Sequence, residues 1–217
     1  MATKMPPRKG VIKKDLTITK KASHRGPLGR AKVLTPEQME RAAVKALEIS
    51  DYGPRDRLFI MLSRFCGLRS KEIASIHVTD LVDAEGNFNG KLYVAERGAK
   101  YGKPRTLTLR PELSEALEDY IKVAGIKDGP IFWTQRGEPC TPNVVRKQIK
   151  TVYLACGYKG ARSHSGRRSA ITMMARNANS VQASLEDVRI WAGHAHIGTT
   201  GIYVDPSPRA EELTKLL

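Results

Sequence analysis

Two arginines and a histidine have the types and spacing that suit work on a phosphate group. Arg69 follows a glycine where a helix is expected to begin, and Arg167 follows His164 by three residues. Three residues along a helix bring two side chains to the same face, so we expect His164 and Arg167 to lie together. Guanidinium groups match the geometry of phosphate oxygens and stay charged at working pH. A histidine beside them can move a proton near neutral pH.

Two further segments contain reactive side chains. Lys100 and Lys103 lie in a stretch with two glycines, which we expect to be the loop of a β-hairpin. Tyr203 follows His194 by nine residues, with a pair of threonines between them. Each segment alone is a weak signal, because a single tyrosine, histidine or lysine usually serves packing or a solvated surface. The ordered set is a strong signal, because four unrelated segments must agree.

Taken in order, these segments resemble the catalytic domain of the tyrosine recombinases, the phage-integrase family. The resemblance spans roughly residues 35–205 and includes a Gly-Leu-Arg-x-x-Glu motif at 67–72 and a Gly-His pair at 193–194. It implies a site-specific DNA recombinase or integrase of a mobile genetic element, such as a phage. It also implies a catalytic set of Arg69, Lys100, His164, Arg167, His194 and Tyr203.

The resemblance implies a covalent mechanism. Tyr203 would attack the scissile phosphorus, form a 3′-phosphotyrosyl link and release a 5′-hydroxyl. The link keeps the bond energy, so a second 5′-hydroxyl can rejoin strands without ATP, a metal ion or another cofactor. Arg69 and Arg167 would hold the non-bridging oxygens, where negative charge builds in the transition state.

The resemblance also assigns the groups that handle protons. His164 would take the proton from Tyr203 or donate a hydrogen bond to the phosphate, and His194 would support the phosphate. Lys100 matches the family's hairpin lysine, which is the acid for the leaving 5′-oxygen. Lys103 remains a rival for that role, because the length of this loop varies.

Two other functions stay open. A type IB topoisomerase-like enzyme would use similar chemistry as a monomer to relax DNA. A DNA-binding regulator with an inactive pocket would need none of it. A zinc site at His164, His194 and His196 is disfavoured, because no cysteine or carboxylate stands at metal-ligand spacing.

The net charge favours a polyanionic partner. The chain of 217 residues has 37 Lys and Arg against 22 Asp and Glu, a formal charge of +15. Residues 1–33 hold ten of these cations and a single acid, Asp15, and the excess in the remainder indicates that the folded part also meets phosphate. We expect the partner to be double-stranded DNA.

Nothing in the sequence favours a membrane or an oxidising compartment. No apolar run approaches the roughly 20 residues that span a bilayer, and no secretory signal follows the basic N-terminus. The three cysteines lie far apart without a CxxC pair, which is typical of a reducing cytosol. We therefore expect a cytoplasmic protein that associates with the nucleoid when it binds DNA.

The elements that position these residues can be read from caps and periodicity. Thr35, Pro36 and Gln38 form a typical helix start, followed by apolar residues at helical spacing. Further helices are expected at 54–65, after Arg69, and at 111–124, 141–155, 166–178, 184–192 and 197–203. Strands are expected at 92–95, 105–109 and 131–133. The predicted fold class is α+β, mainly α-helical, with a small antiparallel three-stranded sheet.

Residues 1–33 are expected to be a flexible basic arm, and 34–217 a catalytic DNA breaking-rejoining domain with a C-terminal tail at 204–217. Most family members carry a separate helical domain before the catalytic one, so this chain resembles the short recombinases. The arm or an accessory protein would then complete the clamp on DNA. The tail would dock onto a neighbouring protomer in a tetramer on paired sites. Gly166 replaces the family's usual hydrophobic residue, which is expected to loosen the start of its helix.

Overall fold

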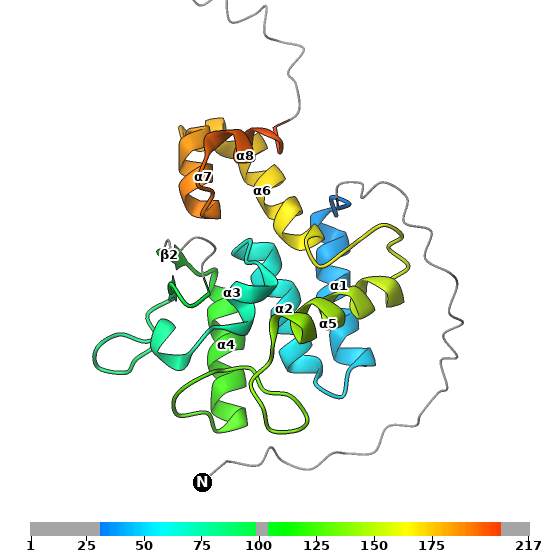
Figure 1. Ribbon diagram of the computed structural model, residues 1–217, viewed down its shortest axis with the longest axis vertical. Coiled ribbons are helices and arrows are strands. Elements are labelled where there is room, and N and C mark those ends of the chain that lie inside the picture. Colours follow the sequence, from blue (N-terminus) through cyan, green and yellow to red (C-terminus); the bar gives the residue numbers. More distant parts are fainter. Residues whose placement is uncertain (1–30, 99–103, 205–217) are drawn as a thin grey trace, which may run out of the picture.

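The computed structural model describes residues 31–98 and 104–204, which form a mainly helical molecule with one small sheet (Figure 1). The helices are α1 (Pro36–Ile49), α2 (Gly53–Phe65), α3 (Ser70–Ala74), α4 (Pro111–Ala124), α5 (Pro142–Ala155), α6 (Ser165–Asn177), α7 (Leu185–Ala192) and α8 (Ile197–Gly201), with 3₁₀ turns η1 (Val78–Asp80) and η3 (Ala178–Val181). The strands are β1 (Lys91–Val94) and β2 (Arg105–Thr108). The arm up to residue 30, the tail from residue 205, Lys100 and Lys103 lie outside the described residues.

The predicted starts of α1 and α4 are confirmed. The Thr35 hydroxyl accepts a hydrogen bond from the Gln38 backbone at 3.2 Å, and the Gln38 side chain accepts one from the Thr35 backbone at 3.0 Å. This reciprocal capping box satisfies two of the amide groups that a helix N-terminus leaves without partners. α4 begins at Pro111 as predicted and ends at Ala124, followed by Gly125, whose φ of 64° suits a left-handed cap.

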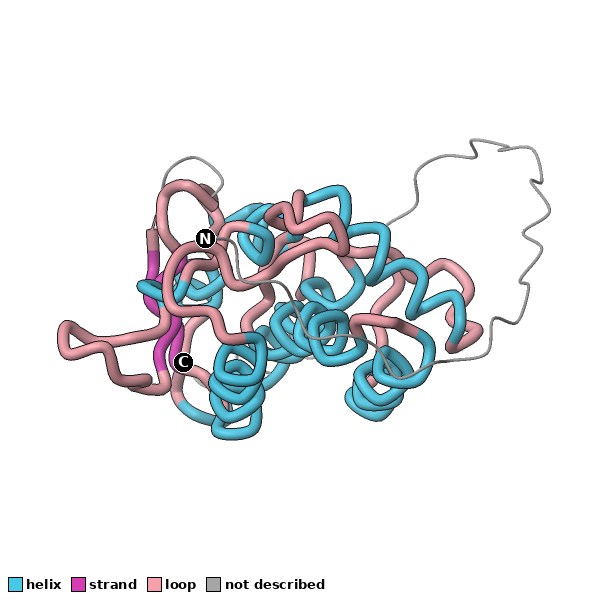
Figure 2. Tube along the Cα trace, turned by 90° about the horizontal axis from the view of Figure 1, so that it is seen from below, coloured by secondary structure: helices cyan, strands magenta, loops and turns pink. Residues whose placement is uncertain are grey.

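In the described part of the chain the sheet has two strands, and residues 131–133 do not form the predicted third one. β1 and β2, the magenta strands of Figure 2, pair antiparallel. Leu92 lies opposite Leu107, and both side chains are buried. Residues 131–133 lie in a loop flanked by isolated bridges in which His77 pairs with Pro130 and Trp133 with Pro139. Proline has no N–H group, so a ladder cannot extend through these pairs.

The hydrophobic core has two parts. The large cluster joins α1–α5 to the sheet, with Phe59 and Phe132 packed edge to face at its centre (4.9 Å between ring centroids). The small cluster is built by α6, η3 and α7 around Ile171 and Val188. α6 runs from one group of helices to the other (Figure 1), and Trp191 packs against both clusters. The C-terminal helices, α6 to α8, are therefore a small C-terminal unit attached to a larger body, which consists of α1–α5 and the sheet.

The last helix is shorter than expected. The pattern predicts a helix over 197–203, whereas α8 ends at Gly201. Gly198 and Gly201 weaken this helix, since glycine costs about 1 kcal/mol relative to alanine inside a helix. Tyr203 consequently lies just beyond the helix end, tied to it by a 3.0 Å hydrogen bond from its backbone N–H to the Thr200 carbonyl.

Gly166 brings two helices together rather than loosening a helix start. A Cβ atom at Gly166 would lie 2.5 Å from Ser63 Oγ on α2 and 3.1 Å from Met39 Cε on α1. The absent side chain thus allows α6, which carries Arg167, to lie directly on α2. Within the described residues, Ser63 Oγ is buried and has no hydrogen-bond partner.

This contact predicts that Gly166→Ala destabilises the protein. Alanine gains about 1 kcal/mol of helix propensity, but overpacking a close contact costs about 1–3 kcal/mol. Ser63→Ala removes the nearest atom, so adding it to Gly166→Ala should recover part of the loss. Urea unfolding of both single variants and the double variant measures this. A Gly166→Ala protein more stable than the wild type would contradict the close packing.

Within residues 31–98 and 104–204, no helix is long and apolar enough to cross a membrane.

Candidate active site

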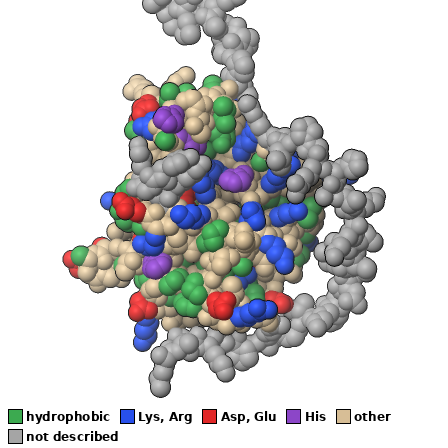
Figure 3. Space-filling view, viewed as in Figure 1, with side chains coloured by type: hydrophobic (Ala, Val, Ile, Leu, Met, Phe, Trp, Pro, Cys, Tyr) green, Lys and Arg blue, Asp and Glu red, His purple; other side chains and the backbone are tan. Residues whose placement is uncertain are grey.

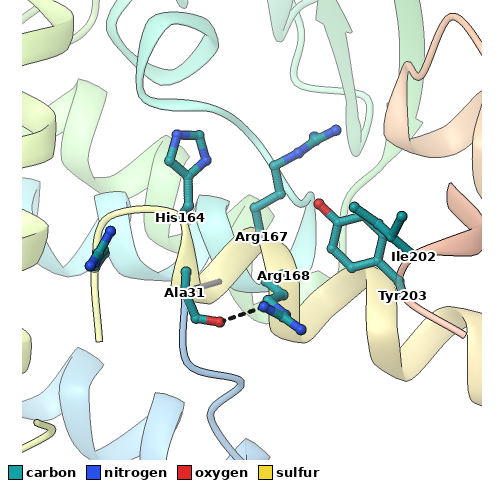
Figure 4. A pocket seen from close by; sticks show the side chains of 7 residues that line it. Ala31, His164, Arg167, Arg168, Ile202 and Tyr203 are labelled. Carbon is teal, nitrogen blue, oxygen red and sulfur yellow. Dashed lines mark hydrogen bonds between the residues drawn. The ribbon is translucent and has the colours of Figure 1, made fainter. Parts of the chain in front are cut away.

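A pocket of about 300 Å³ opens beside the start of α6 (Figure 4). Its lining consists of Ala31, Arg162, His164, Arg167, Arg168, Ile202 and Tyr203. Among the described residues no carboxylate lines it, and several Lys, Arg and His side chains gather across the middle of the face shown in Figure 3. A pocket with this charge suits an anionic ligand such as a phosphate group.

Arg167 is the buried centre of the site. Its side chain is only 3% exposed. Nη1 donates to the Gly67 carbonyl, and Nη2 donates to the Ala192 carbonyl at 2.7 Å and contacts His194 Nε2 at 2.9 Å. A guanidinium has five N–H donors, so two remain for a ligand in the pocket. Burial, together with nearby Arg69, lowers the pKa of Arg167 to about 9, which leaves it charged at neutral pH.

His194 supports Arg167. Because a guanidinium only donates, Nε2 of His194 must accept from Arg167, so the ring proton is on Nδ1. Nδ1–H then donates to the Thr200 hydroxyl, 2.8 Å away on α8. Burial, with Arg167 and other arginines nearby, lowers the pKa of His194 to about 4. The buried imidazole is therefore neutral at physiological pH and braces the arginine against α8.

Tyr203 stacks on this histidine. The two ring centroids lie 5.8 Å apart and the ring planes differ by 19°. In Figure 4 the phenol oxygen of Tyr203 points toward the side chain of Arg167. The ring is half-buried in the small C-terminal cluster, while its oxygen faces the pocket. The tyrosine, the histidine and the arginine therefore form one connected group within a single chain.

His164 lines the same pocket from the residue that precedes α6. Its side chain is exposed and extends from the helix start in the same direction as that of Arg167 (Figure 4). The predicted three-residue spacing therefore does bring these two side chains to one face. Arg168, the next residue, turns away and donates to the Ala31 carbonyl at 3.0 Å.

Arg69 is held by a buried carboxylate. Its backbone N–H donates to Glu72 Oε2 at 2.7 Å, and its Nη1 donates to Glu72 Oε1 at 3.0 Å. Burial alone would raise the pKa of Glu72, but Arg105 and Arg69 hold it below its usual range. Glu72 thus braces Arg69 at the start of α3. Arg69 also lies close enough to Arg167 and His194 to lower both of their pKa values.

Arg105 belongs to the site, although sequence reasoning assigned it only to a strand. Its Nη1 donates to Glu72 Oε1 at 3.0 Å, and its Nε donates to the Trp191 carbonyl at 2.9 Å. These partners are 33 and 86 residues away in the chain. The only signal in the sequence is a cation next to a predicted hairpin loop, which is too common to identify such a contact.

The low pKa of His194 predicts a loss of stability in mild acid. The unfolded histidine binds a proton below its ordinary pKa of 6.5, whereas the folded one resists protonation until about pH 4. The stabilisation that neutral His194 gives the folded protein is thus complete above pH 6.5 and is lost as the pH falls from 6.5 toward 4. Urea unfolding at a series of pH values measures this slope. His194→Gln should flatten it, and an unchanged slope in that variant would contradict the assignment.

In the part of the chain that the structure describes, no group of three His, Cys, Asp or Glu side chains could hold a metal ion.

The chain resembles known proteins in sequence. The chain matches the model of the phage integrase family over residues 32–209. It is 29% identical over 172 residues to the tyrosine recombinase XerC of Caldanaerobacter subterraneus subsp. tengcongensis, covering 76% of this chain and 45% of the relative. It is 28% identical over 177 residues to a tyrosine recombinase of Pseudothermotoga lettingae, covering 80% and 58%. The chain thus spans about half the length of these relatives.

Solved structures share the fold. The crystal structure of XerA recombinase aligns with a TM-score of 0.66 at 19% identity, covering 85% of this chain and 64% of that one. The XerH site-specific recombinase, in its pre-cleavage complex with difH substrate, aligns with a TM-score of 0.70 at 22% identity, covering 91% and 58%. With the family model matching most of its length, this chain belongs to the phage integrase family, the tyrosine recombinases.

Proposed function

We propose that this protein is a site-specific DNA recombinase or integrase that cuts and rejoins strands through a 3′-phosphotyrosyl intermediate. The main support is one arrangement, in which Tyr203 stacks on His194 and His194 accepts a hydrogen bond from buried Arg167. A nucleophile and a fixed cation that line one basic pocket suit attack on a phosphodiester. Family membership supports the same reaction.

In the proposed reaction the phenolate oxygen of Tyr203 forms a bond to the scissile phosphorus. The bond to the 5′-oxygen breaks, and that oxygen leaves as a hydroxyl after taking a proton. Arg69 and the free donors of Arg167 stabilise the non-bridging oxygens. His164 accepts the phenol proton of Tyr203 or donates a hydrogen bond to the phosphate, and Lys100, rather than Lys103, protonates the leaving oxygen. A 5′-hydroxyl from another strand reverses the attack, so no ATP or metal ion is consumed.

The proposed partner is double-stranded DNA, and the proposed working form is a tetramer on paired sites. Two solved relatives, XerH and a lambda integrase dimer, were crystallised on their DNA substrates or core sites. The net charge of +15 favours such binding. Residues 1–33 would follow the DNA backbone, and the tail at 204–217 would dock onto the next protomer. An accessory protein could complete the clamp, with the complex located on DNA in the cytoplasm.

The deciding experiment captures the covalent intermediate. The protein is incubated with fragmented DNA from its source, the mixture is denatured, and DNA still attached to protein is recovered and sequenced. Wild-type protein should yield adducts enriched in one sequence, while Tyr203→Phe yields none. That result would identify the nucleophile and the recombination site together.

Other outcomes separate the rival functions. Adducts without sequence enrichment, together with relaxation of supercoiled plasmid, would favour a type IB topoisomerase-like activity. DNA that is retained before denaturation but never attached covalently would favour a DNA-binding regulator. Either result would overturn the proposal of a site-specific recombinase.

A further inference from the structure

The end of α7 is the point where the C-terminal unit meets the body. A helix leaves its last carbonyl groups without partners inside the helix. Gly193, with φ of 63°, closes α7 through a hydrogen bond from its own N–H to Ile190, and the N–H of His194 donates to Arg189. The carbonyls of Trp191 and Ala192 are satisfied by two arginines from other elements, Arg105 on β2 and Arg167 on α6. His194 therefore follows a helix end that the body holds in place.

Arg105 connects this helix end to the other half of the site. The same guanidinium that binds the Trp191 carbonyl also binds Glu72, which in turn holds the backbone and the side chain of Arg69. The Arg105 side chain is only 8% exposed and Glu72 is fully buried, so water does not weaken these contacts. A single side chain thus relates the position of Arg69 to the position of His194.

Two glycines leave room for the contacts of Arg105 and Trp191 at this helix end. A Cβ atom at Gly193 would lie 2.7 Å from Nη1 of Arg105, and its positive φ already disfavours other residues. On the opposite side, a Cβ atom at Gly67 would lie 2.8 Å from the ring of Trp191. The glycine that precedes His194 therefore lets Arg105 approach, and the glycine near Arg69 admits the tryptophan ring.

We infer that Arg105 is a positioning residue that sets Arg69 and His194 at their working separation. It acts through Glu72 on one side and through the Trp191 carbonyl on the other, without contact to DNA. Lysine cannot replace it, because one ammonium lacks the planar fork that reaches two acceptors in different directions. The consequence for catalysis rests on the proposed function, whereas the effect on His194 can be measured in the free protein.

The test compares Arg105→Lys and Arg105→Gln with a matched control, Arg97→Gln. Arg97 also binds both a carbonyl, that of Ser75, and a carboxylate, that of Asp80, but both of these partners lie within the body. NMR titration of the His194 ring in DNA-free protein is the first readout. Both Arg105 variants should shift its ring signals, and Arg105→Gln should raise its pKa, because a neighbouring cation is lost. Arg97→Gln should leave the His194 signals unchanged.

The second readout is the reaction on a duplex carrying the sequence recovered from covalent adducts. Arg105→Lys should bind this duplex within about threefold of wild type, while adduct formation slows by up to about 10²-fold, the effect of displacing a catalytic group by an ångström. Thermal unfolding identifies any variant that fails to fold. If Arg105→Gln does not fold, the test uses Arg105→Lys, which keeps the charge. Unchanged His194 signals in the folded Arg105 variants would overturn the inference. A wild-type chain without adducts would overturn only the proposed function.

Discussion

Tyr203→Phe is expected to bind DNA as tightly as the wild type and to form no covalent DNA adduct. The phenyl ring can keep its stacking on His194 and its place in the small cluster, so only the attacking oxygen is lost. Removing a nucleophile from an otherwise intact site lowers rates on the order of 10⁴-fold or more. Neither remaining arginine can replace it, because guanidinium groups stay protonated and do not attack phosphorus.

The measurement combines a binding assay with denaturing electrophoresis of labelled duplex. Tyr93→Phe provides the matched control, because Tyr93 is 46% exposed on β1 and belongs to no part of the pocket. That control should form adducts at the wild-type rate. Adducts that persist in Tyr203→Phe would place the nucleophile elsewhere. Loss of DNA binding in the same variant would show instead that the hydroxyl is needed to hold the substrate.

Local signals in the sequence predicted most of the helices. A cap and a proline at the first turn specify where α1 and α4 begin, because these features satisfy the amide groups of the helix N-terminus. The three-residue spacing of His164 and Arg167 likewise places both side chains at one pocket, since helical geometry is a local property. The chemistry of the remaining segments is recognisable only as an ordered set that resembles a family.

Predictions that depended on distant partners were less successful. The apolar residues at 131–133 have strand-like composition, but the preceding Pro130 pairs with distant His77 and Trp133 pairs with Pro139, and the local apolar pattern reveals neither pairing. The sequence predicts that Gly166 weakens its helix, and only the structure shows that Ser63 packs against it. Arg105 depends on contacts up to 86 residues away. Long-range packing of this kind is decided by the whole fold rather than by the neighbouring residues.

Arg167→Lys should cost both stability and activity, because Arg167 serves the fold and the pocket at once. It fills the space between Gly67, Ala192 and His194, three acceptors that a lysine ammonium cannot reach together. Each buried carbonyl left without a donor costs about 1–3 kcal/mol. The donors that face the pocket are lost as well, and removing a preorganised donor lowers rates by about 10²–10³-fold.

The free energy of unfolding in urea and the rate of adduct formation should therefore both decrease in Arg167→Lys. Arg64→Lys supplies the control, because Arg64 pairs with exposed Glu40 on the surface and an exposed pair contributes only about 0–1 kcal/mol. Since His194 accepts its hydrogen bond from Arg167, its ring should also titrate closer to its ordinary pKa of 6.5 in Arg167→Lys. An Arg167→Lys protein with wild-type stability but without adducts would show that Arg167 acts on the phosphate alone. Loss of stability with full activity would assign it to the fold alone.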